Sequence, residues 1–155
     1  MSGRIETVLQ QKGIELPQAA APAANYVPAV RAGKLLFIAG QIPIWNGEIK
    51  WVGRVGKELS VEQGQQAARL CALNIIAQAK AACGGDLDRI ARCVKLDGFV
   101  QCSDDFIQQP QVVNGASDLM VEVFGDAGRH ARVAVGTNAL PRGVAVEVAA
   151  VFELA

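Results

Sequence analysis

The sequence is poor in the residues that usually hold metal ions or bind nucleic acids. Among its 155 residues there is one histidine, His130, and the four cysteines include no C-x-x-C pair, so we expect no metal site. Lys plus Arg and Asp plus Glu both number 15, which gives a formal net charge of zero. Nucleic-acid-binding domains usually carry a basic excess or a basic face, so this balance argues against a nucleic-acid partner.

The sequence also lacks long hydrophobic runs. No window of about 18 apolar residues occurs, so we expect no transmembrane helix and no membrane partner. The first residues include Glu6 and no continuous apolar stretch, which argues against a signal peptide. With no such signal, the four cysteines are interpreted as reduced, mostly buried thiols of a cytoplasmic protein.

What the chain does have is a large share of small and branched apolar residues. Hydrophobic residues make up 51% of the sequence and the mean hydropathy is +0.23. The length suits one domain with one core. We divide the chain into an N-terminal helix and connector, residues 1–20, and the domain proper, residues 21–155. The apolar excess over a single small core suggests that some of it is buried between subunits.

Helical spacing of apolar residues is clearest after residue 60. Ser60 and Gln63 have the form of a capping box, and the helix is expected to run to about Ala82, before a Gly-Gly pair. A second long helix should reach about Phe124. It could begin at Ser103 or Asp104, or near Pro110, because proline is tolerated only in a first turn. A short helix is expected over residues 2–13, followed by an Ala- and Pro-rich connector.

Strands are predicted where β-branched and aromatic residues cluster between turn residues. The expected strands are residues 26–30, 34–42, 51–52, 90–100, 132–137 and 144–152. Ala32-Gly33 should turn the first hairpin, and Asn46-Gly47 is a stronger turn signal. Two helix-then-strand blocks in this order predict an α+β fold with each helix on one sheet face.

Three stretches of the chain carry a resemblance to a known family. They are LLFIAGQIP at residues 35–43, QVVNGASDLM at 111–120 and ARVAVGTNALPRGVAVEVAAV at 131–151. In the last stretch, the spacing of Arg, Leu-Pro and Glu matches a family signature. The chain thereby resembles the RidA/YjgF family of imine deaminases, whose members are also labelled endoribonuclease L-PSP or translation initiation inhibitor.

The resemblance implies a chorismate-mutase-like fold. Its sheet is mixed and mostly antiparallel, with two helices on one face. It also implies a homotrimer whose clefts between subunits bind small carboxylate metabolites. No metal or organic cofactor is implied.

Two residues are expected to do the chemistry. Arg132 matches the family arginine that grips the substrate carboxylate, for which the planar guanidinium fork is suited. Glu147 matches a glutamate that positions water and moves protons in active members. Without the resemblance, Arg132 would be read as a surface ion-pair residue, and Glu147 as a residue on a solvated strand face.

Further positions are expected to line the cleft, on the strength of the resemblance. The substrate-binding residues are Tyr26, Ala39, Gly40, Asn114 and Ala134, with Gln41 beside them. Two of these depart from the family pattern, because Ala39 stands where deaminating members often have Ser and Ala134 where they often have Cys. His130 has no family counterpart and is expected at the cleft rim or surface.

Three functions stay open at this point. The first is hydrolytic deamination of reactive 2-imino and enamino acids to 2-keto acids and ammonia. The second is binding of a small carboxylate without turnover, which the two alanines favour. The third is ribonuclease or translation inhibition, against which the balanced charge argues.

Overall fold

The computed structural model describes residues 3–21 and 24–155. Within these residues, five strands form one sheet in the order β1-β2-β7-β5-β6. The strands are β1 (Ala29–Ala32), β2 (Leu35–Gln41), β5 (Ile90–Gln101), β6 (Ala131–Thr137) and β7 (Val146–Leu154). All neighbours are antiparallel except β5 and β6, which run parallel. The predicted α+β fold with a mixed, mostly antiparallel sheet is confirmed.

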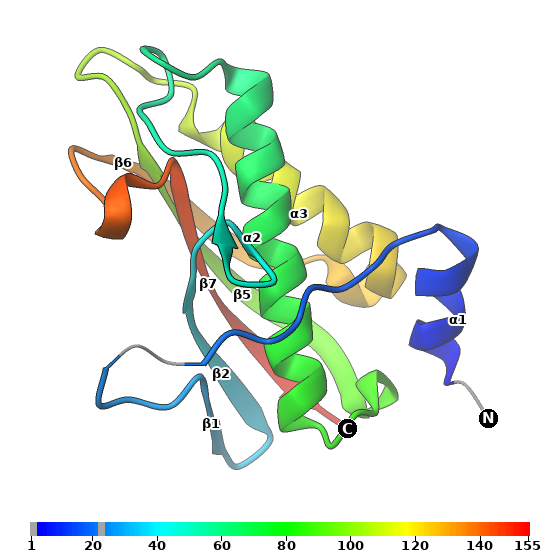
Figure 1. The fold of residues 1–155 in the computed structure, drawn as a ribbon. Coiled ribbons are helices and arrows are strands. Elements are labelled where there is room, and N and C mark those ends of the chain that lie inside the picture. Colours follow the sequence, from blue (N-terminus) through cyan, green and yellow to red (C-terminus); the bar gives the residue numbers. More distant parts are fainter. Residues whose placement is uncertain (1–2, 22–23) are drawn as a thin grey trace.

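Two long helices, α2 (Val61–Ala82) and α3 (Gln109–Phe124), lie side by side over one face of the sheet (Figure 1). The capping box is present. The Ser60 hydroxyl accepts a hydrogen bond from the backbone N–H of Gln63, and the Gln63 side chain accepts one from the backbone N–H of Ser60. The other long helix begins at Gln109, so Pro110 stands in its first turn and the later of the two predicted starts is correct.

Glycine lets these two helices approach each other closely. A Cβ added at Gly115 of α3 would collide with the backbone of Gln65 in α2, and one at Gly64 would press on Val112 at 3.1 Å. Gln65 Nε2 also donates to the carbonyl oxygen of Gln111, 2.9 Å away. The close packing of α2 against α3 therefore fixes the position of α3 and of the polar residues that it carries.

The first predicted hairpin is only partly right. The two strands pair as expected, but β1 begins at Ala29 and not at residue 26. The turn is at Gly33-Lys34 and not at Ala32-Gly33, since Ala32 still pairs with Leu35. The predicted strand at 51–52 is wrong. Trp51 has φ of 57° and Val52 makes only an isolated bridge, while the Asn-Gly turn instead joins β3 (Ile44–Trp45) and β4 (Glu48–Ile49). A left-handed residue cannot continue a pleated strand.

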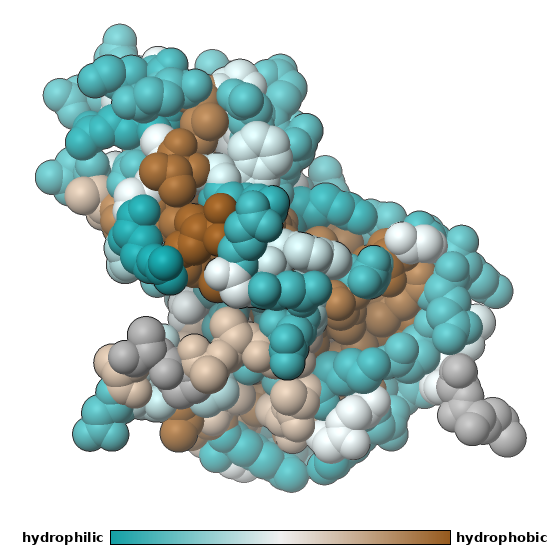
Figure 2. Space-filling view, in the orientation of Figure 1, coloured by the Kyte–Doolittle hydropathy of each residue, from teal (hydrophilic) through white to brown (hydrophobic). Residues whose placement is uncertain are grey.

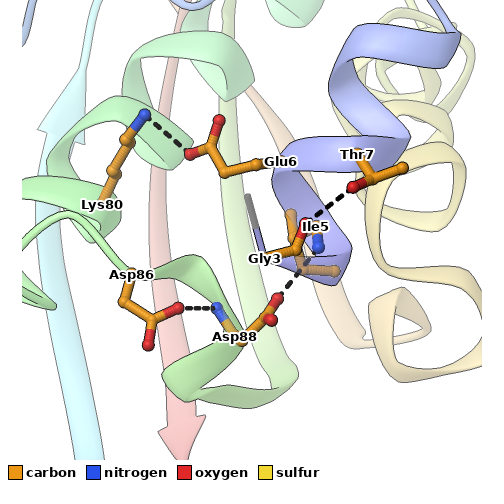
Figure 3. Close-up of polar contacts among 7 residues, drawn as sticks. All are labelled: Gly3, Ile5, Glu6, Thr7, Lys80, Asp86 and Asp88. Carbon is orange, nitrogen blue, oxygen red and sulfur yellow. Dashed lines mark hydrogen bonds and ion pairs between the residues drawn. The ribbon is translucent and has the colours of Figure 1, made fainter. Parts of the chain in front are cut away.

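The N-terminal helix α1 (Arg4–Gln11) shares the core of the domain, since Ile5 and Leu9 are buried in it. The two oxygens of Asp88 accept from the backbone N–H groups of Arg4 and Ile5, at 2.8 and 2.9 Å. Figure 3 shows the bond from Ile5 and the ion pair of Glu6 with Lys80, at 2.7 Å. A carboxylate at a helix N-terminus satisfies donors that have no partner within the helix. The helix predicted over residues 2–13 is thus confirmed as α1, with one turn fewer at its ends. Residue 2 lies outside the described residues.

The connector that follows α1 runs across the outer face of α2 toward β1 (Figure 1). Two amide side chains hold it there. Asn46 accepts from the backbone N–H of Gln18 at 2.7 Å, and the buried Gln78 of α2 donates to the carbonyl oxygen of Ala20 at 2.7 Å. The connector is therefore an ordered strap in its described residues. On this side of the molecule, hydrophobic atoms are visible between α1 and the long helices (Figure 2).

None of the helices described covers the other face of the sheet. Large hydrophobic side chains stand exposed on it; they are Val30, Leu35, Phe37, Val133 and Val135. Their strand neighbours with the opposite parity, such as Leu36 and Ile38, are buried in the core. The four cysteines are free and buried within the described part of the chain, as predicted. None of the helices described is long and apolar enough to cross a membrane.

Candidate functional site

Arg132 lies on β6 and is held by two side chains of α3. Its Nη1 donates to Asn114 Oδ1 at 2.8 Å and to Ser117 Oγ at 3.1 Å. Asn114 and Ser117 are three residues apart, so they lie on the same face of the helix. The structure therefore brings together Arg132 and Asn114, two of the residues predicted from the sequence. Ser117 was not predicted, although its position three residues after Asn114 was a usable signal.

His130 completes this network. Its Nδ1 lies 2.6 Å from the carbonyl oxygen of Gly128, which can only accept, so Nδ1 carries a proton. Its Nε2 lies 2.9 Å from Ser117 Oγ, and a neutral ring accepts the hydroxyl proton there. The lone pairs of Ser117 then face Arg132. Burial lowers the pKa of His130, and the charge of Arg132 lowers it further, against the raising effect of the Gly128 carbonyl. His130 thus supports the arginine and is half-buried.

Glu147 lies at the start of β7 and lines a cavity of about 290 Å³, which we call the Glu147 cavity. This volume is near the lower end of the range for small-molecule sites. The polar residues and the glycine that line it are Tyr26, Gly40, Gln41, Gln78, Arg142 and Glu147. Ala20 and Ala21 of the strap form part of its wall. Three predicted residues, Tyr26, Gly40 and Gln41, therefore meet Glu147 in one cavity.

The carboxylate of Glu147 occupies the space that a side chain at residue 40 would need. A Cβ built at Gly40 would lie 3.1 Å from the carboxyl carbon of Glu147 and closer still to Oε2. Burial raises the pKa of Glu147 above its ordinary range, because desolvation disfavours the charged form. A carboxyl group with a raised pKa is suited to exchange protons near neutral pH.

The structure does not bring Arg132 and Glu147 together within one chain. Arg132 is in register with Leu96, a core residue, and its guanidinium points to α3 on the helix side. Glu147 alternates with Val146 and Val148, which are buried in the core, so its side chain leaves the opposite face of the sheet. Neither residue lines the cavity of the other. A joint site therefore requires a second chain.

The remaining predicted positions lie near these two groups. Ala134 is on β6, two residues after Arg132, and packs against the core on the helix side. Ala39 lies in the bulged part of β2, where its backbone N–H donates to the carbonyl oxygen of Pro28 at 3.0 Å. Neither alanine offers a polar side chain to a ligand. Tyr26 is half exposed at the mouth of the Glu147 cavity.

Two polar residues that line the Glu147 cavity were not predicted. Gln78 is buried on α2, and Arg142 belongs to the short 3-10 turn η3 (Pro141–Gly143). The Arg-Gly pair after Leu140-Pro141 was visible in the sequence, but only folding brings it to this cavity. Among residues 3–21 and 24–155, no three His, Cys, Asp or Glu side chains gather as a metal site.

Together, the fold and these groups define a small α+β domain with an open apolar sheet face and an arginine held at the sheet edge. The chain belongs to the YjgF/chorismate mutase-like family, which is the RidA/YjgF family. Residues 6–154 match the family described as "YjgF/chorismate_mutase-like, putative endoribonuclease". The resemblance of the three sequence stretches is thereby confirmed.

Relatives and solved structures agree with this assignment. Protein TCP17 from Trypanosoma cruzi is 52% identical over 154 residues, covering 99% of this chain and 96% of that protein. The crystal structure of Atu1372 from Agrobacterium tumefaciens is 47% identical, with a TM-score of 0.91, and covers 97% of this chain and 92% of that one. The structure of Escherichia coli TdcF with bound serine is 25% identical, with a TM-score of 0.59, over 90% and 94% of the two chains.

Proposed function

We propose that the protein assembles as a trimer and hydrolyses small reactive 2-imino and enamino acids to 2-keto acids and ammonia. Each cleft would combine Arg132 of one chain with Glu147 and Tyr26 of the next. The observation that carries the proposal is the guanidinium of Arg132, which Asn114 and Ser117 hold in place on a strand at the edge of the described sheet. A fixed guanidinium binds a carboxylate in two places and so fixes the ligand orientation.

The open sheet face supports assembly. Phe37 is 44% exposed and Val135 is 45% exposed, on a face that no helix of residues 3–21 or 24–155 covers. Exposed apolar patches of this kind usually mark interaction sites. The same face carries Glu147, in register with Phe99 and, through it, with Val135. A second chain that covers this face would therefore lie next to the carboxylate.

The proposed hydrolysis of the imine needs few groups from the protein. An enamino acid first becomes the imine by moving a proton from its nitrogen to its terminal carbon. Water then adds to the imine carbon, so that a C–O bond forms and the C=N π bond breaks, which gives a carbinolamine. The carbinolamine hydroxyl loses its proton as the C–N bond breaks, which releases ammonia and leaves the 2-keto acid. Glu147, in its ionised form, takes each of these two protons from oxygen and passes it to the nitrogen. Its partly buried position keeps its pKa closer to neutral, so both steps are available to it. No cofactor is needed for these steps. We place the protein in the cytoplasm, where dehydratases and other pyridoxal phosphate enzymes generate such imines.

A coupled assay that generates 2-aminoacrylate tests this function. We expect pyruvate to be released faster with the wild-type protein than without it. The variant Arg132→Ala should lose most of that acceleration, since the carboxylate is no longer held. Equal rates for the wild type and this variant would reject the proposal. Light scattering on the same samples should give the mass of three chains.

A second function is favoured by Ala39 and Ala134, which give the expected cleft no hydroxyl or thiol group. In this alternative, the cleft binds a small keto acid and does not turn it over. The serine in the TdcF structure is compatible with either function, since serine is a small carboxylate. A crystal soaked with a keto acid that binds at Arg132, with no imine hydrolysis in solution, would select the alternative.

A further inference from the structure

The Glu147 cavity contains a guanidinium that the mechanism above does not use. Arg142 of η3 lines it together with Glu147 and Tyr26. Among the described residues that line the cavity, Arg142 is the one with a positive charge. The ion pairs within residues 3–21 and 24–155 do not include Arg142. Its charge is therefore available to an anionic ligand in this cavity.

The backbone that presents Arg142 is strained. Arg142 has φ of 59° and ψ of 15°, a left-handed conformation that is unfavourable for a residue other than glycine. Strain of this kind persists only where the surroundings enforce it, and it is concentrated at functional sites. The next residue, Gly143, also has positive φ, at 72°.

One buried side chain enforces this conformation. Gln101, only 6% exposed, accepts from the backbone N–H of Leu140 at 2.8 Å and donates to the carbonyl oxygen of Gly143 at 3.0 Å. Its Nε2 also donates to the carbonyl oxygen of Gly53 at 3.0 Å. Gln101 thus holds both ends of the turn that carries Arg142, so the guanidinium starts from a fixed backbone.

The balance of charge sets the kind of ligand. In the proposed trimer, one cleft would contain two guanidinium groups, that of Arg132 from one chain and that of Arg142 from the other, which lines the same cavity as Glu147. Arg132 is sufficient for the carboxylate next to the imine carbon. A second guanidinium adds affinity only if the ligand carries a second anionic group.

We propose that Arg142 binds a second acidic group of the ligand, so that the protein selects small dicarboxylic 2-imino or 2-keto acids over monocarboxylic ones. This inference rests on the proposed function, because it assumes that the first carboxylate is held by Arg132. It assigns Arg142 a role in specificity, acting on the part of the ligand away from the reacting carbon.

Calorimetry with two matched keto acids tests the inference. The compounds are 2-oxoglutarate and 2-oxopentanoate, in which a methyl group replaces the distal carboxylate. We expect the wild type to bind 2-oxoglutarate about tenfold more tightly or better, as suits one charge-assisted hydrogen-bonded pair. Arg142→Gln should remove this preference and leave the affinity for 2-oxopentanoate within about twofold.

Further variants keep the test independent of folding. Arg142→Asn suits the left-handed backbone better than Gln does and should give the same loss of preference. Arg142→Lys keeps the charge and should retain most of it. Arg4→Gln, an exposed arginine on α1 that lines neither cavity, should leave both affinities unchanged.

The outcomes separate this inference from the proposed function. Equal affinities of the wild type for the two keto acids would overturn the inference, and so would a failure of the wild type to bind either one. An equal loss of affinity for both keto acids in Arg142→Gln would also overturn it. Hydrolysis of 2-aminoacrylate that depends on Arg132 would then still support the proposed function. Conversely, a dicarboxylate preference that depends on Arg142, with no acceleration of imine hydrolysis, would retain the inference and select binding without turnover.

Discussion

The Nη1 of Arg132 on β6 lies 2.8 Å from the Oδ1 of Asn114 on α3. The contact joins residues from two elements, an edge strand and a helix packed over the sheet. It fixes one side of the guanidinium and leaves its other N–H groups for a ligand, because guanidinium carries five donors.

Removing the amide at residue 114 should weaken substrate binding more than catalysis. Asn114→Ala leaves Arg132 with Ser117 alone, so the guanidinium becomes less well oriented. We expect KM to rise about fivefold, the scale of one hydrogen bond of about 1 kcal/mol, with kcat nearly unchanged. Gln111→Ala, an exposed amide on the same helix, is the matched control and should behave as the wild type. A fall in kcat at constant KM would contradict this role.

A methyl group at residue 40 should displace the carboxylate of Glu147. The φ of Gly40 is not among the positive values, so alanine is compatible with its backbone, but its Cβ would meet the glutamate side chain. We expect Gly40→Ala to lower kcat about tenfold, because a shift of the carboxylate misplaces the attacking water. Thermal unfolding should change little. Gly33→Ala is not a suitable control, since φ there is 62°. An unchanged kcat in Gly40→Ala would contradict the view that catalysis depends on the position of the Glu147 carboxylate.

Neutralising Glu147 should stabilise the folded protein while it reduces activity. The folded-state pKa of Glu147 is raised, so the folded state keeps its proton to higher pH than the unfolded chain does. This group therefore lowers the free energy of unfolding as pH rises from the ordinary range of a glutamate through the raised pKa. Glu147→Gln should be more stable than the wild type at pH 7 and equally stable well below that window. Its kcat should fall about a hundredfold. Denaturant unfolding at several pH values measures the first effect.

The stability contributed by His130 should change with pH in the direction opposite to that of Glu147. Its folded-state pKa is lowered, so the unfolded chain binds a proton that the folded state resists. The wild type should lose stability as pH falls from about 6.5, by no more than about 1.4 kcal/mol per pH unit for one proton. In His130→Gln this loss should be absent, so the free energies of unfolding of the wild type and the variant should converge at acid pH. An identical pH dependence in both proteins would refute the interpretation.

Mixed trimers test whether each site is shared between chains. Arg132→Ala and Glu147→Gln chains should both be inactive alone. If they are denatured together and refolded at equal concentrations, about a quarter of the sites would pair an intact arginine with an intact glutamate across the interface. We expect about a quarter of wild-type activity. No recovery in mixtures that form trimers would place both residues of a working site in one chain.

The local elements were largely predictable because they depend on short-range patterns. The capping box at Ser60 and the helical spacing after it identified α2, and the proline at residue 110 gave one of the two starts considered for α3. Trp51 was wrongly assigned, since nothing in its neighbours indicates that the backbone there is left-handed. The importance of Arg132 came from a resemblance and not from its own surroundings in the sequence.

The amino-acid sequence by itself determined the α+β class, the approximate positions of the helices and the identity of the charged groups, because helical spacing and capping residues are local patterns. Tertiary structure alone decided their arrangement. The side-chain faces of Arg132 and Glu147 depend on the register of β5 with both β6 and β7, and these pairings join residues far apart in the chain. A shift of one residue would reverse either face. For the same reason, only the folded chain shows that Arg142 and Glu147 line one cavity and that Arg132 lies outside it.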